Sequence, residues 1–402
     1  MNILILTDAY FPTNSSVSVL LSDLAQALIA QSVKVSILVS VSEQDCPLKI
    51  WQHEGCEVIS IKAMRTKDIG YIRRTINEFV NPWFMWRILK KSSHFQGKNY
   101  DGVVWYSPTI FWGPLIKKIK NKFRCKSYLI LRDIFPDWAM HLGVIEDGFA
   151  YWFFKKIEQY QYRQADYIGV QSLNNLSYFQ KHNPDAGRRA QVLWNWISKP
   201  LTSTPKAYSI NLSNTFLRNK VVFVYAGNLG VAQGGAKNLL ALAKNLRSYP
   251  TLGILVVGRG SAIDILRYEI ANANLNNILV HDEIDATEMP SLLKQCHIGL
   301  VLLDRRHLTH NIPGKFLTYL QSGLPVLAWV NPGNDLIELI STRDLGFAYA
   351  GENIIEFANL ARVLANKHSI DTNFSGRSNK FLEKQFSPSL QARQIIFSLA
   401  EA

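Results

Sequence analysis

A lysine stands at the start of a predicted helix in the segment HNIPGKFLTYLQSGLPV, residues 310–326. Pro313 and Gly314 open this helix, Lys315 follows them, and apolar residues then recur at helical spacing. The first turn of a helix has backbone N–H groups without partners, which a carboxylate or hydroxyl usually caps. A cation at this end opposes the helix dipole. The residue types therefore favour an anion bound at Lys315 and the open amides; the alternative is a surface lysine near a helix start.

Two glycine-rich turns follow the apolar runs 221–226 and 253–257. Their candidate ligand-binding residues are Gly227, Asn228, Gly230 and Gln233 after the first run, and Gly258 and Arg259 after the second. Glycine lets a backbone approach a ligand closely, and the carboxyl ends of parallel strands share one edge of a sheet. We therefore expect these turns, Arg259 and Lys315 to converge there. Several N–H donors and two cations suit a diphosphate, although each turn alone could be only a tight connection.

The amino-terminal half carries two further candidate segments at predicted strand ends. The first is DAYFPTNSS, which begins at Asp8 and contains Asn14, Ser15 and Ser16; these three could cap the next helix or face a ligand. The second is RDIFPDW, which begins with Arg132 and Asp133. Asp133 could orient a hydroxyl of a second substrate, or it could be neutralised by Arg132 as a structural pair.

Short apolar runs alternate with helical patterns along the chain. Predicted strands cover 2–7, 33–39, 58–61, 102–105, 127–131, 167–171 and 191–193 in a first series, and 221–226, 253–257, 277–281, 298–303 and 325–330 in a second. Runs of Val, Ile and Leu separated by helices are typical of parallel sheets covered on both faces. The segment 198–219 is rich in Ser, Thr, Asn and Pro and is expected to link the two series. The predicted fold class is α/β, with two doubly wound domains.

The composition is that of a globular chain of 402 residues, 48% hydrophobic and 19% charged. No apolar run reaches the length of about 18 residues that a transmembrane helix needs. The first residues, MNILILTDAYF, lack the basic start and cleavage site of a signal peptide and are predicted to form a strand. The four cysteines show no CxxC spacing, so reduced thiols are expected rather than a metal site or a disulfide framework.

The net charge of +13 is concentrated in one segment. Between Arg65 and Lys126, fourteen basic residues stand against three acidic ones, a net of +11. Such a block suggests nucleic acid, an anionic membrane surface or an acidic substrate as partner. The alternative is a basic surface that is simply solvated.

Seven motifs, in order, resemble the GT-B glycosyltransferases of the retaining family 4. They are DAYFP, RDIFPDWAMHLGVI, ADYIGVQS, LWNWIS, FVYAGNLGVAQG, VVGRGS and IPGKFLTYLQSGLPVLA. The set is most similar to that of bacterial enzymes of O-antigen or capsule assembly, the N-acetyl-L-fucosaminyl transferases. The resemblance implies two Rossmann-like domains facing a cleft, transfer with retention from a nucleotide-sugar, and no metal. No cofactor is implied, because the nucleotide-sugar is a substrate.

The resemblance also assigns roles along the chain. It implies an acceptor-binding domain at 1–200 with a basic membrane-facing segment, a donor-binding domain at 215–385, and a terminal helix at 386–402 that packs on the first domain. The residues expected in catalysis are Asp133, Lys315 and Arg259. Those expected to bind the donor are Ser15, Ser16, Gly227, Asn228, Gly230, Gln233, Gly258, His310, Asn311, Pro313, Gly314 and Thr318. Those expected to bind the acceptor are Asp8, Asn14 and Arg132.

The chain departs from the family pattern at several of these positions. Two glutamates that the family usually carries eight positions apart, around the helix that contains Lys315, are replaced by His310 and Thr318. The usual Gly-Gly of the first loop is Ser15-Ser16, and Arg259 stands where an acidic residue is familiar. These changes favour one alternative, a non-catalytic nucleotide-sugar-binding or scaffold protein. A nucleotide-sugar epimerase of the same fold is a second alternative among enzymes.

The basic segment combines cations with aromatic residues at 82–91 and again at 111–120. Such segments suit helices at a membrane surface, although the aromatics could instead pack in the core. With the resemblance, this predicts an enzyme at the inner face of the bacterial cytoplasmic membrane, acting on a polyprenyl-diphosphate-linked saccharide with a UDP-linked or a GDP-linked donor. Nucleic acid is not expected, because the aromatics alternate with aliphatics rather than forming a stacking platform.

Overall fold

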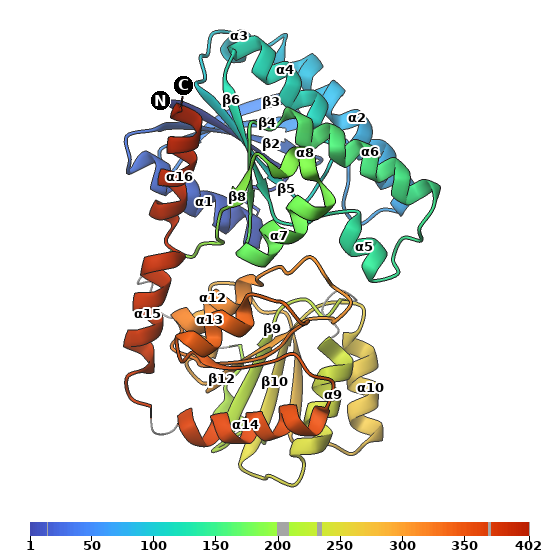
Figure 1. Cartoon of the computed structure of the whole chain (residues 1–402), viewed down its shortest axis with the longest axis vertical. Helices are drawn as coiled ribbons and strands as arrows, with labels where there is room; N and C mark the ends of the chain where they lie inside the picture. The colour runs from blue at the N-terminus through green and yellow to red at the C-terminus, as the bar shows by residue number, and fades with distance from the viewer. Residues whose placement is uncertain (14, 199–208, 231–234, 369–370, 402) are drawn as a thin grey trace. The chain divides into compact units, whose positions relative to one another are not determined.

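The computed structural model describes residues 1–13, 15–198, 209–230, 235–368 and 371–401. The chain divides into two compact units (Figure 1). Unit 1 consists of Met1–Ser198 together with Ser387–Ala402, and unit 2 consists of Lys199–Phe386. Each unit is built around its own β-sheet, and each is described by itself below.

The sheet of unit 1 has eight strands in the order β3-β4-β2-β1-β5-β6-β7-β8. They are β1 (Asn2–Thr7), β2 (Lys34–Val41), β3 (Leu48–His53), β4 (Cys56–Lys62), β5 (Gly102–Ser107), β6 (Lys126–Leu131), β7 (Tyr167–Val170) and β8 (Ala190–Val192). All pairings are parallel except that of β3 with β4. That hairpin turns through Glu54 and Gly55, both at positive φ, the geometry that a two-residue turn requires. The strand order reverses beside β1, which lies between β2 and β5.

Helices cover both faces of this sheet. They are α1 (Ser16–Ile29), α2 (Tyr71–Leu89), α3 (Ser93–Gln96), α4 (Gly113–Phe123), α5 (Asp137–His141), α6 (Phe149–Gln164), α7 (Leu173–His182), α8 (Pro184–Gly187) and α16 (Pro388–Ala400). Alternate residues of each strand point to opposite faces, so the apolar side chains form two clusters. One cluster packs under α2 and α4, and the other packs under α1 and α16.

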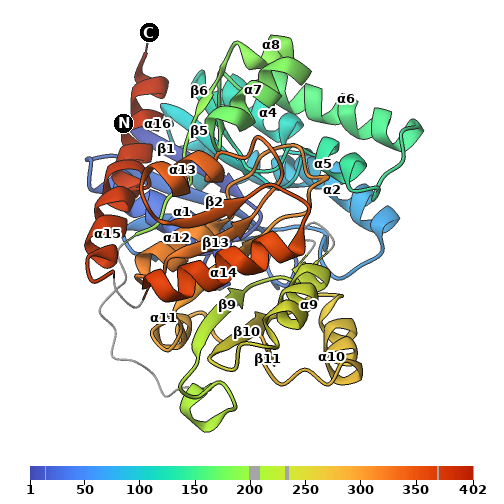
Figure 2. The ribbon, with the colours of Figure 1, turned by 60° about the horizontal axis from the view of Figure 1, so that its bottom comes forward.

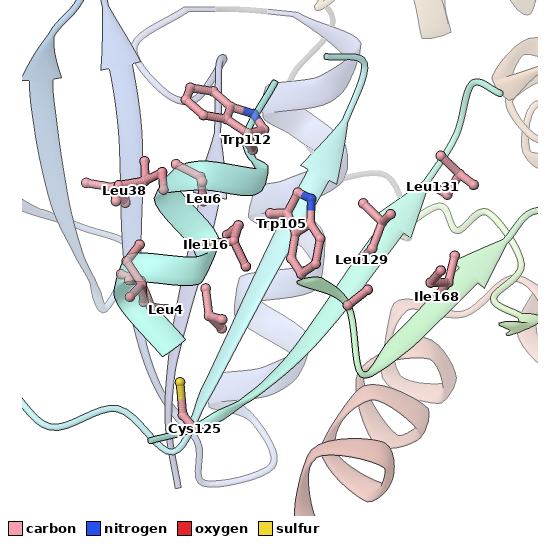
Figure 3. Close-up of a cluster of buried hydrophobic side chains, with 14 of the residues drawn as sticks. Leu4, Leu6, Leu38, Trp105, Trp112, Ile116, Cys125, Leu129, Leu131 and Ile168 are labelled. Atoms are coloured by element: carbon pink, nitrogen blue, oxygen red, sulfur yellow. The ribbon is translucent and has the colours of Figure 1, made fainter. Parts of the chain in front are cut away.

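The first cluster decides how the aromatic segment 111–120 is used. Trp112, just before α4, and Ile116 within it belong to the same buried cluster as Leu4, Trp105 and Leu129 of the strands (Figure 3). Phe111 and Trp112 are 5% and 4% exposed, whereas the lysines at 117 and 118 face solvent. The aromatic side chains Phe111 and Trp112 therefore form core, as the alternative expected, and helix α4 exposes a basic edge; a membrane-facing role for this edge stays a prediction.

The sheet of unit 2 has six parallel strands in the order β11-β10-β9-β12-β13-β14. They are β9 (Val221–Ala226), β10 (Leu252–Gly258), β11 (Ile278–Asp282), β12 (Ile298–Leu302), β13 (Val326–Trp329) and β14 (Gly346–Tyr349). Its helices are α9 (Gly235–Leu246), α10 (Ile263–Asn272), α11 (Met289–Leu293), α12 (Gly314–Gln321), α13 (Leu336–Thr342), α14 (Ile354–His368) and α15 (Phe374–Gln385), with a 3-10 turn at Leu212–Asn214 (Figure 2). The order reverses beside β9, which lies between β10 and β12.

The predicted fold class, α/β with two doubly wound Rossmann-like domains, is confirmed. In such sheets ligands bind beyond the carboxyl ends of the strands, where the strand order reverses. The topology therefore directs attention to the turn after β9 in unit 2 and to the turn after β1 in unit 1. None of the described helices is long and apolar enough to cross a bilayer.

Candidate functional site

The turn after β9 is packed directly on the turn after β10. Gly227 has φ +130°, a conformation that L side chains rarely adopt. A Cβ on residue 258 would lie 1.9 Å from the carbonyl oxygen of Gly227, so only glycine fits at this point of β10. The N–H of Leu229 also donates to the carbonyl of Arg259 over 2.8 Å. The two glycine turns therefore converge, as the sequence predicted.

Lys315 reaches this turn from the amino end of α12. Its Nζ lies 3.6 Å from the ring centroid of Tyr225, and a Cβ on residue 227 would stand 3.5 Å from the same atom. The ammonium is thus held over an aromatic face at the place where the strand order reverses. We call Lys315, Tyr225, Gly227 and the amino end of α12 the Lys315 site.

The Lys315 Nζ is buried and has no hydrogen-bond partner among the described residues. Burial of the ammonium lowers the pKa of Lys315 to about 7. An unpaired buried cation is costly, and the ring of Tyr225 compensates only part of the lost hydration. A bound anion is the group that would satisfy this atom.

The amino end of α12 adds backbone donors to the same site. Pro313 occupies the N-cap position and offers no side-chain oxygen to the first turn, which contains no acidic residue. A Cβ on Gly314 would meet nothing within 4 Å, so there is open space beside the first helical residue. Open amides, the positive end of the helix dipole and Lys315 together make a site for phosphate oxygens.

Two tyrosines that the sequence analysis did not select hold this geometry. Tyr319, one turn after Lys315 and fully buried, accepts a hydrogen bond of 2.8 Å from the N–H of Ala226 at the end of β9. Gly299 in β12 leaves the room for its ring, since a Cβ there would lie 2.3 Å from Tyr319 atoms. Tyr225 donates its hydroxyl to the carbonyl of Asn228 over 2.9 Å. Their spacing in the sequence could have pointed to them. Tyr319 follows Lys315 by four residues, about one helical turn, and Tyr225 precedes Gly227 by two.

The remaining predicted residues of the β9 and β10 turns lie as follows. Asn228 is exposed, and its amide nitrogen covers Gly230, where a Cβ would lie 3.1 Å away. Gln233 lies outside the described residues. Within this turn, Asn228 is therefore the exposed side chain among the described residues.

Arg259 does not join Lys315 with its side chain. Its guanidinium is 78% exposed and lies 3.4 Å from a carboxylate oxygen of Glu283, which follows β11. The backbone of Arg259 packs in the turn, but its cation belongs to the surface at the neighbouring strand end. Among the two predicted cations, the structure brings only Lys315 to the Gly227 turn.

His310 and Asn311 are held by the loop after β13. The Nδ1 of His310 lies 3.0 Å from the side-chain amide nitrogen of Asn331, and the carbonyl of Asn311 accepts from Asn334 over 3.3 Å. Burial lowers the pKa of His310, and the Asp335 carboxylate opposes that shift. Asn331 and Asn334 are buried, so this contact fixes the loop that leads into α12. The geometry gives His310 a structural hydrogen bond.

Thr318 lies on α12, one turn after Gly314. Its hydroxyl donates to the Gly314 carbonyl over 3.3 Å, which is the usual back-bond of threonine in a helix. Thr318 therefore adds no charge to the helix that begins at Gly314.

In unit 1, Asp8 and Asp133 follow β1 and β6, the two strands that flank β5. The carboxylates of Asp8 and Asp133 both act on the pKa of Tyr106, which lies near the end of β5. Burial raises its pKa, the Arg132 guanidinium lowers it, and Asp133 and Asp8 raise it further. Asp8 has one buried carboxylate oxygen without a hydrogen-bond partner among the described residues, and its other oxygen lies 3.8 Å from the Lys67 Nζ. The carboxyl edge of this sheet therefore gathers two carboxylates and a phenol.

Arg132 is a buried structural group in this edge. Its guanidinium donates to the carbonyls of Leu193 and Trp194 and lies 4.8 Å from the ring of Trp196. Burial lowers the pKa of Arg132 to about 10. These contacts tie β6 to the segment after β8, and an acceptor-binding role for Arg132 stays a prediction.

Ser15 and Ser16 stand at the start of α1. Ser15 is the N-cap, and its hydroxyl accepts from the N–H of Ser18 over 3.1 Å. Ser16 is exposed as the first helical residue, and Asn14 lies outside the described residues. The capping alternative thus holds for Ser15.

A buried charged network follows Asp133 and was not selected from the sequence. The Lys155 Nζ lies 2.7 Å from a carboxylate oxygen of Asp137 and 2.7 Å from one of Glu158. The hydroxyl of Tyr162 donates to Glu158 over 2.6 Å. Burial raises the pKa of Glu158 to about 7, and the Lys155 ammonium opposes that shift. The network fastens α5 to α6 and so fixes the segment that leaves Asp133.

Among the described residues, no three His, Cys, Asp or Glu side chains lie close enough together to hold a metal ion. The Lys315 site presents amides and one ammonium, a set of donors for an anion.

Comparison of the whole structure with solved structures finds several similar chains. Sucrose-phosphate synthase from Thermosynechococcus elongatus is 13% identical over 98% of this chain and 97% of that one, with a TM-score of 0.73. Anabaena Alr3699/HepE in complex with UDP and glucose is 16% identical over 100% and 99%, with a TM-score of 0.65. WaaG, a glycosyltransferase involved in lipopolysaccharide biosynthesis, is 13% identical over 99% and 100%, with a TM-score of 0.64. These likenesses show a shared fold.

By sequence, no curated protein matches this chain. One family model does match, that of the Glycosyl transferases group 1, over residues 220–367. The matched segment contains β9 to β14 and the whole Lys315 site. Residues 220–367 are therefore similar to the group 1 glycosyltransferase domain, and the whole chain has the fold of the solved structures named above.

Proposed function

We propose that this protein is a retaining glycosyltransferase that uses a nucleotide-sugar donor. One observation carries the proposal: the buried, unpartnered Lys315 Nζ stands over Tyr225 at the Gly227 turn, next to the uncapped start of α12. A nucleoside diphosphate has two negatively charged phosphate groups, which match the ammonium and the uncapped amides of this site. The group 1 family match over the same residues supports this choice of anion.

The chemistry follows from the position of the cation. As the bond between the anomeric carbon and the diphosphate breaks, negative charge grows on the leaving oxygen. Lys315 and the amides of α12 stabilise that charge without reorganising, and in many enzymes such preorganised electrostatic stabilisation contributes most of the rate enhancement. The acceptor oxygen bonds to the same face of the sugar, and its proton passes to the departing diphosphate. We propose that this ammonium and these dipoles serve in place of a metal ion.

A UDP-linked sugar is the donor that we propose. The solved Anabaena relative in fold is a complex with UDP and glucose. The motifs of the chain are most similar to those of N-acetyl-L-fucosaminyl transferases, so UDP-N-acetyl-L-fucosamine is the first specific sugar to test. The GDP-linked sugars form the comparison set.

The acceptor that we propose is a saccharide linked to a polyprenyl diphosphate, used in O-antigen or capsule synthesis at the inner face of the cytoplasmic membrane. The solved relative WaaG is involved in lipopolysaccharide biosynthesis, which supports this class of acceptor. Asp133 and Asp8, at the carboxyl edge of the unit 1 sheet, are the groups proposed to orient the acceptor hydroxyl. A carboxylate accepts the hydroxyl proton as a hydrogen bond and so aims the oxygen.

Binding without turnover is the second candidate, favoured by one specific observation. His310 is engaged by Asn331, and Thr318 is bonded to its own helix, so the two usual glutamates have no charged replacement there. A site that binds the diphosphate through Lys315 but binds the ribose weakly is what we expect of a nucleotide-sugar-binding scaffold protein.

Product analysis separates these functions. Purified protein is incubated with a panel of UDP- and GDP-sugars, with and without a prenyl-diphosphate-linked saccharide. We expect release of the nucleoside diphosphate that increases severalfold with acceptor, and a new glycosidic bond with the donor's anomeric configuration. Tight nucleotide binding without turnover across the panel would point to the scaffold. Conversion of the donor sugar without acceptor would point to an epimerase.

A further inference from the structure

Helix α2 presents a stripe of exposed apolar side chains. Ile72, Ile76, Phe79 and Trp83 are 81%, 56%, 49% and 50% exposed. Their spacing of four, three and four residues places them on one face of the helix. Exposed apolar residues scattered singly are normal, but a continuous stripe of this size marks an interaction surface.

Helix α6, which like α2 packs on α4, carries a second group of exposed apolar side chains. Phe149 and Trp152 at its start are 79% and 55% exposed. Ring contacts join the two helices through the core: Phe79 lies 6.3 Å from Phe111, which lies 6.4 Å from Phe154 of α6. Figures 1 and 2 both show α2 and α6 on the same side of unit 1. We call Ile72, Ile76, Phe79, Trp83, Phe149 and Trp152 the α2–α6 face.

Cations surround the α2–α6 face. Arg87 and Lys90 continue the same stripe of α2 toward its carboxyl end, and both are exposed. Helix α4, which contacts both α2 and α6, exposes Lys117 and Lys118. The Lys156 Nζ lies 5.7 Å from the ring centroid of Trp152.

The acidic groups of this region are few or engaged. Glu78 on α2 is bonded to Arg74 over 2.7 Å and to Thr109 over 2.8 Å. Glu146 and Asp147 are exposed just before α6, so the excess positive charge comes from α2 and α4. Two copies of this positively charged face would repel each other, and the net charge of +13 adds to that repulsion. A second copy of the chain is therefore disfavoured as the partner.

We propose that the α2–α6 face docks on an anionic lipid bilayer. Aromatic and aliphatic side chains enter the boundary between head groups and acyl chains, while the arginines and lysines meet lipid phosphates. The observations that select this occupant are the mixture of Ile, Phe and Trp on one face and the cations at its border. The inference rests on the proposed function only in one respect, that a docked enzyme would meet a lipid-linked acceptor.

Vesicle flotation of the full chain tests the docking. Vesicles contain phosphatidylcholine alone or phosphatidylcholine with an equal part of phosphatidylglycerol. We expect the protein to float with the anionic vesicles and to be released by salt. The triple variant Ile72→Ser, Ile76→Ser, Trp83→Ser should lower the partition coefficient at least about tenfold. Arg87→Glu with Lys90→Glu should lower it by roughly fivefold or more per charge.

A matched variant controls for general loss of surface hydrophobicity. Ile265→Ser with Tyr268→Ser removes two side chains of α10 in unit 2 that are 63% and 66% exposed. This control should float like the unchanged protein. Equal flotation of all variants would overturn the proposal, and so would a dimer in solution that the triple variant dissociates while no variant floats.

The flotation assay contains neither donor nor acceptor. A failure of docking therefore leaves the turnover assay unaffected, and a failure of turnover leaves flotation unaffected. Transfer to a water-soluble acceptor analogue should be unchanged in the triple variant, whereas transfer to an acceptor held in anionic vesicles should fall at least about tenfold.

Discussion

At the residue scale, the central feature is a lysine whose charge the fold does not satisfy. The Nζ of Lys315 is buried on Tyr225 without a hydrogen-bond partner among the described residues, and burial lowers the pKa of Lys315 to about 7. Natural sites often sacrifice stability for function in this way. The loss of stability and the gain in binding can be measured separately.

Replacing Lys315 by Met should stabilise the unliganded protein. The lysine pKa is depressed in the folded state from its ordinary value of 10.5, so folding disfavours the charged form. The penalty is fully present below pH 7 and fades as pH rises toward the unfolded pKa. Unfolding free energies from denaturant titrations should favour Lys315→Met by a few kcal/mol, as an order of magnitude, at pH 6 and by little at pH 10. A variant that is less stable at pH 6 would show that the lysine has a structural partner.

Affinity for a UDP-sugar should fall as pH rises through the pKa of free Lys315. The bound diphosphate favours the charged ammonium, so binding takes up a proton when the free lysine is neutral. Calorimetry with UDP-glucose, whose diphosphate does not titrate near neutrality, should show constant affinity below pH 7 and a loss approaching about tenfold per unit above it. The Lys315→Ala variant should show no such slope, and a flat profile in the unchanged protein would contradict the charge-based account.

At the scale of elements, the site depends on close packing of two turns. Gly258 is the residue that lets the β10 end lie against the Gly227 carbonyl. Gly258→Ala should displace the β9 turn, reduce UDP-glucose affinity by more than about tenfold and lower the midpoint of thermal unfolding by several degrees. Gly376→Ala in α15 is the matched control, because a Cβ there meets nothing within 4 Å. That variant should keep full affinity and gain stability.

Most elements could be predicted because buried strands leave continuous apolar runs in the sequence. The run 221–226 coincides with β9, and the run 2–7 coincides with β1. Strand β3, LKIWQH, was not predicted, because its residues are half-exposed at the sheet edge and polar side chains interrupt the pattern. The order of strands was enough to bring Lys315 and Gly227 together, since both follow strands at the point of reversal.

Side-chain direction could not be predicted in the same way. Sequence places Arg259 at the correct strand end, but only the structure shows its guanidinium beside Glu283. Sequence also cannot decide which aromatics of the basic segment face solvent. Phe111 and Trp112 pack inward on the strands, whereas Trp83 faces solvent on α2. The two tyrosines of the Lys315 site look like ordinary core residues until the fold places them.

At the scale of the whole molecule, the two units carry separate proposed tasks. Unit 2 holds the Lys315 site for the nucleotide-sugar, and unit 1 carries the α2–α6 face together with the carboxylates proposed to orient the acceptor. Hydrogen exchange of the full chain should therefore give two footprints. UDP-glucose should protect the amides near 227–230, 258–260 and 314–318, and anionic vesicles should protect 71–89.

The control for the two footprints asks whether either ligand protects the amides expected to be protected by the other. Vesicles without nucleotide should leave the amides of the Lys315 site unchanged. Strong protection by UDP-glucose that is confined to unit 1 would contradict the placement of the donor site, whatever the vesicles do.

The most direct measurement is the affinity of Lys315→Ala for UDP-glucose by calorimetry at pH 7, beside Lys244→Ala, which removes an exposed lysine from α9 in the same unit. We predict a loss of at least about tenfold for Lys315→Ala, with folding intact, and no change for Lys244→Ala. Equal affinity in the two variants would contradict the claim that the buried ammonium binds the diphosphate.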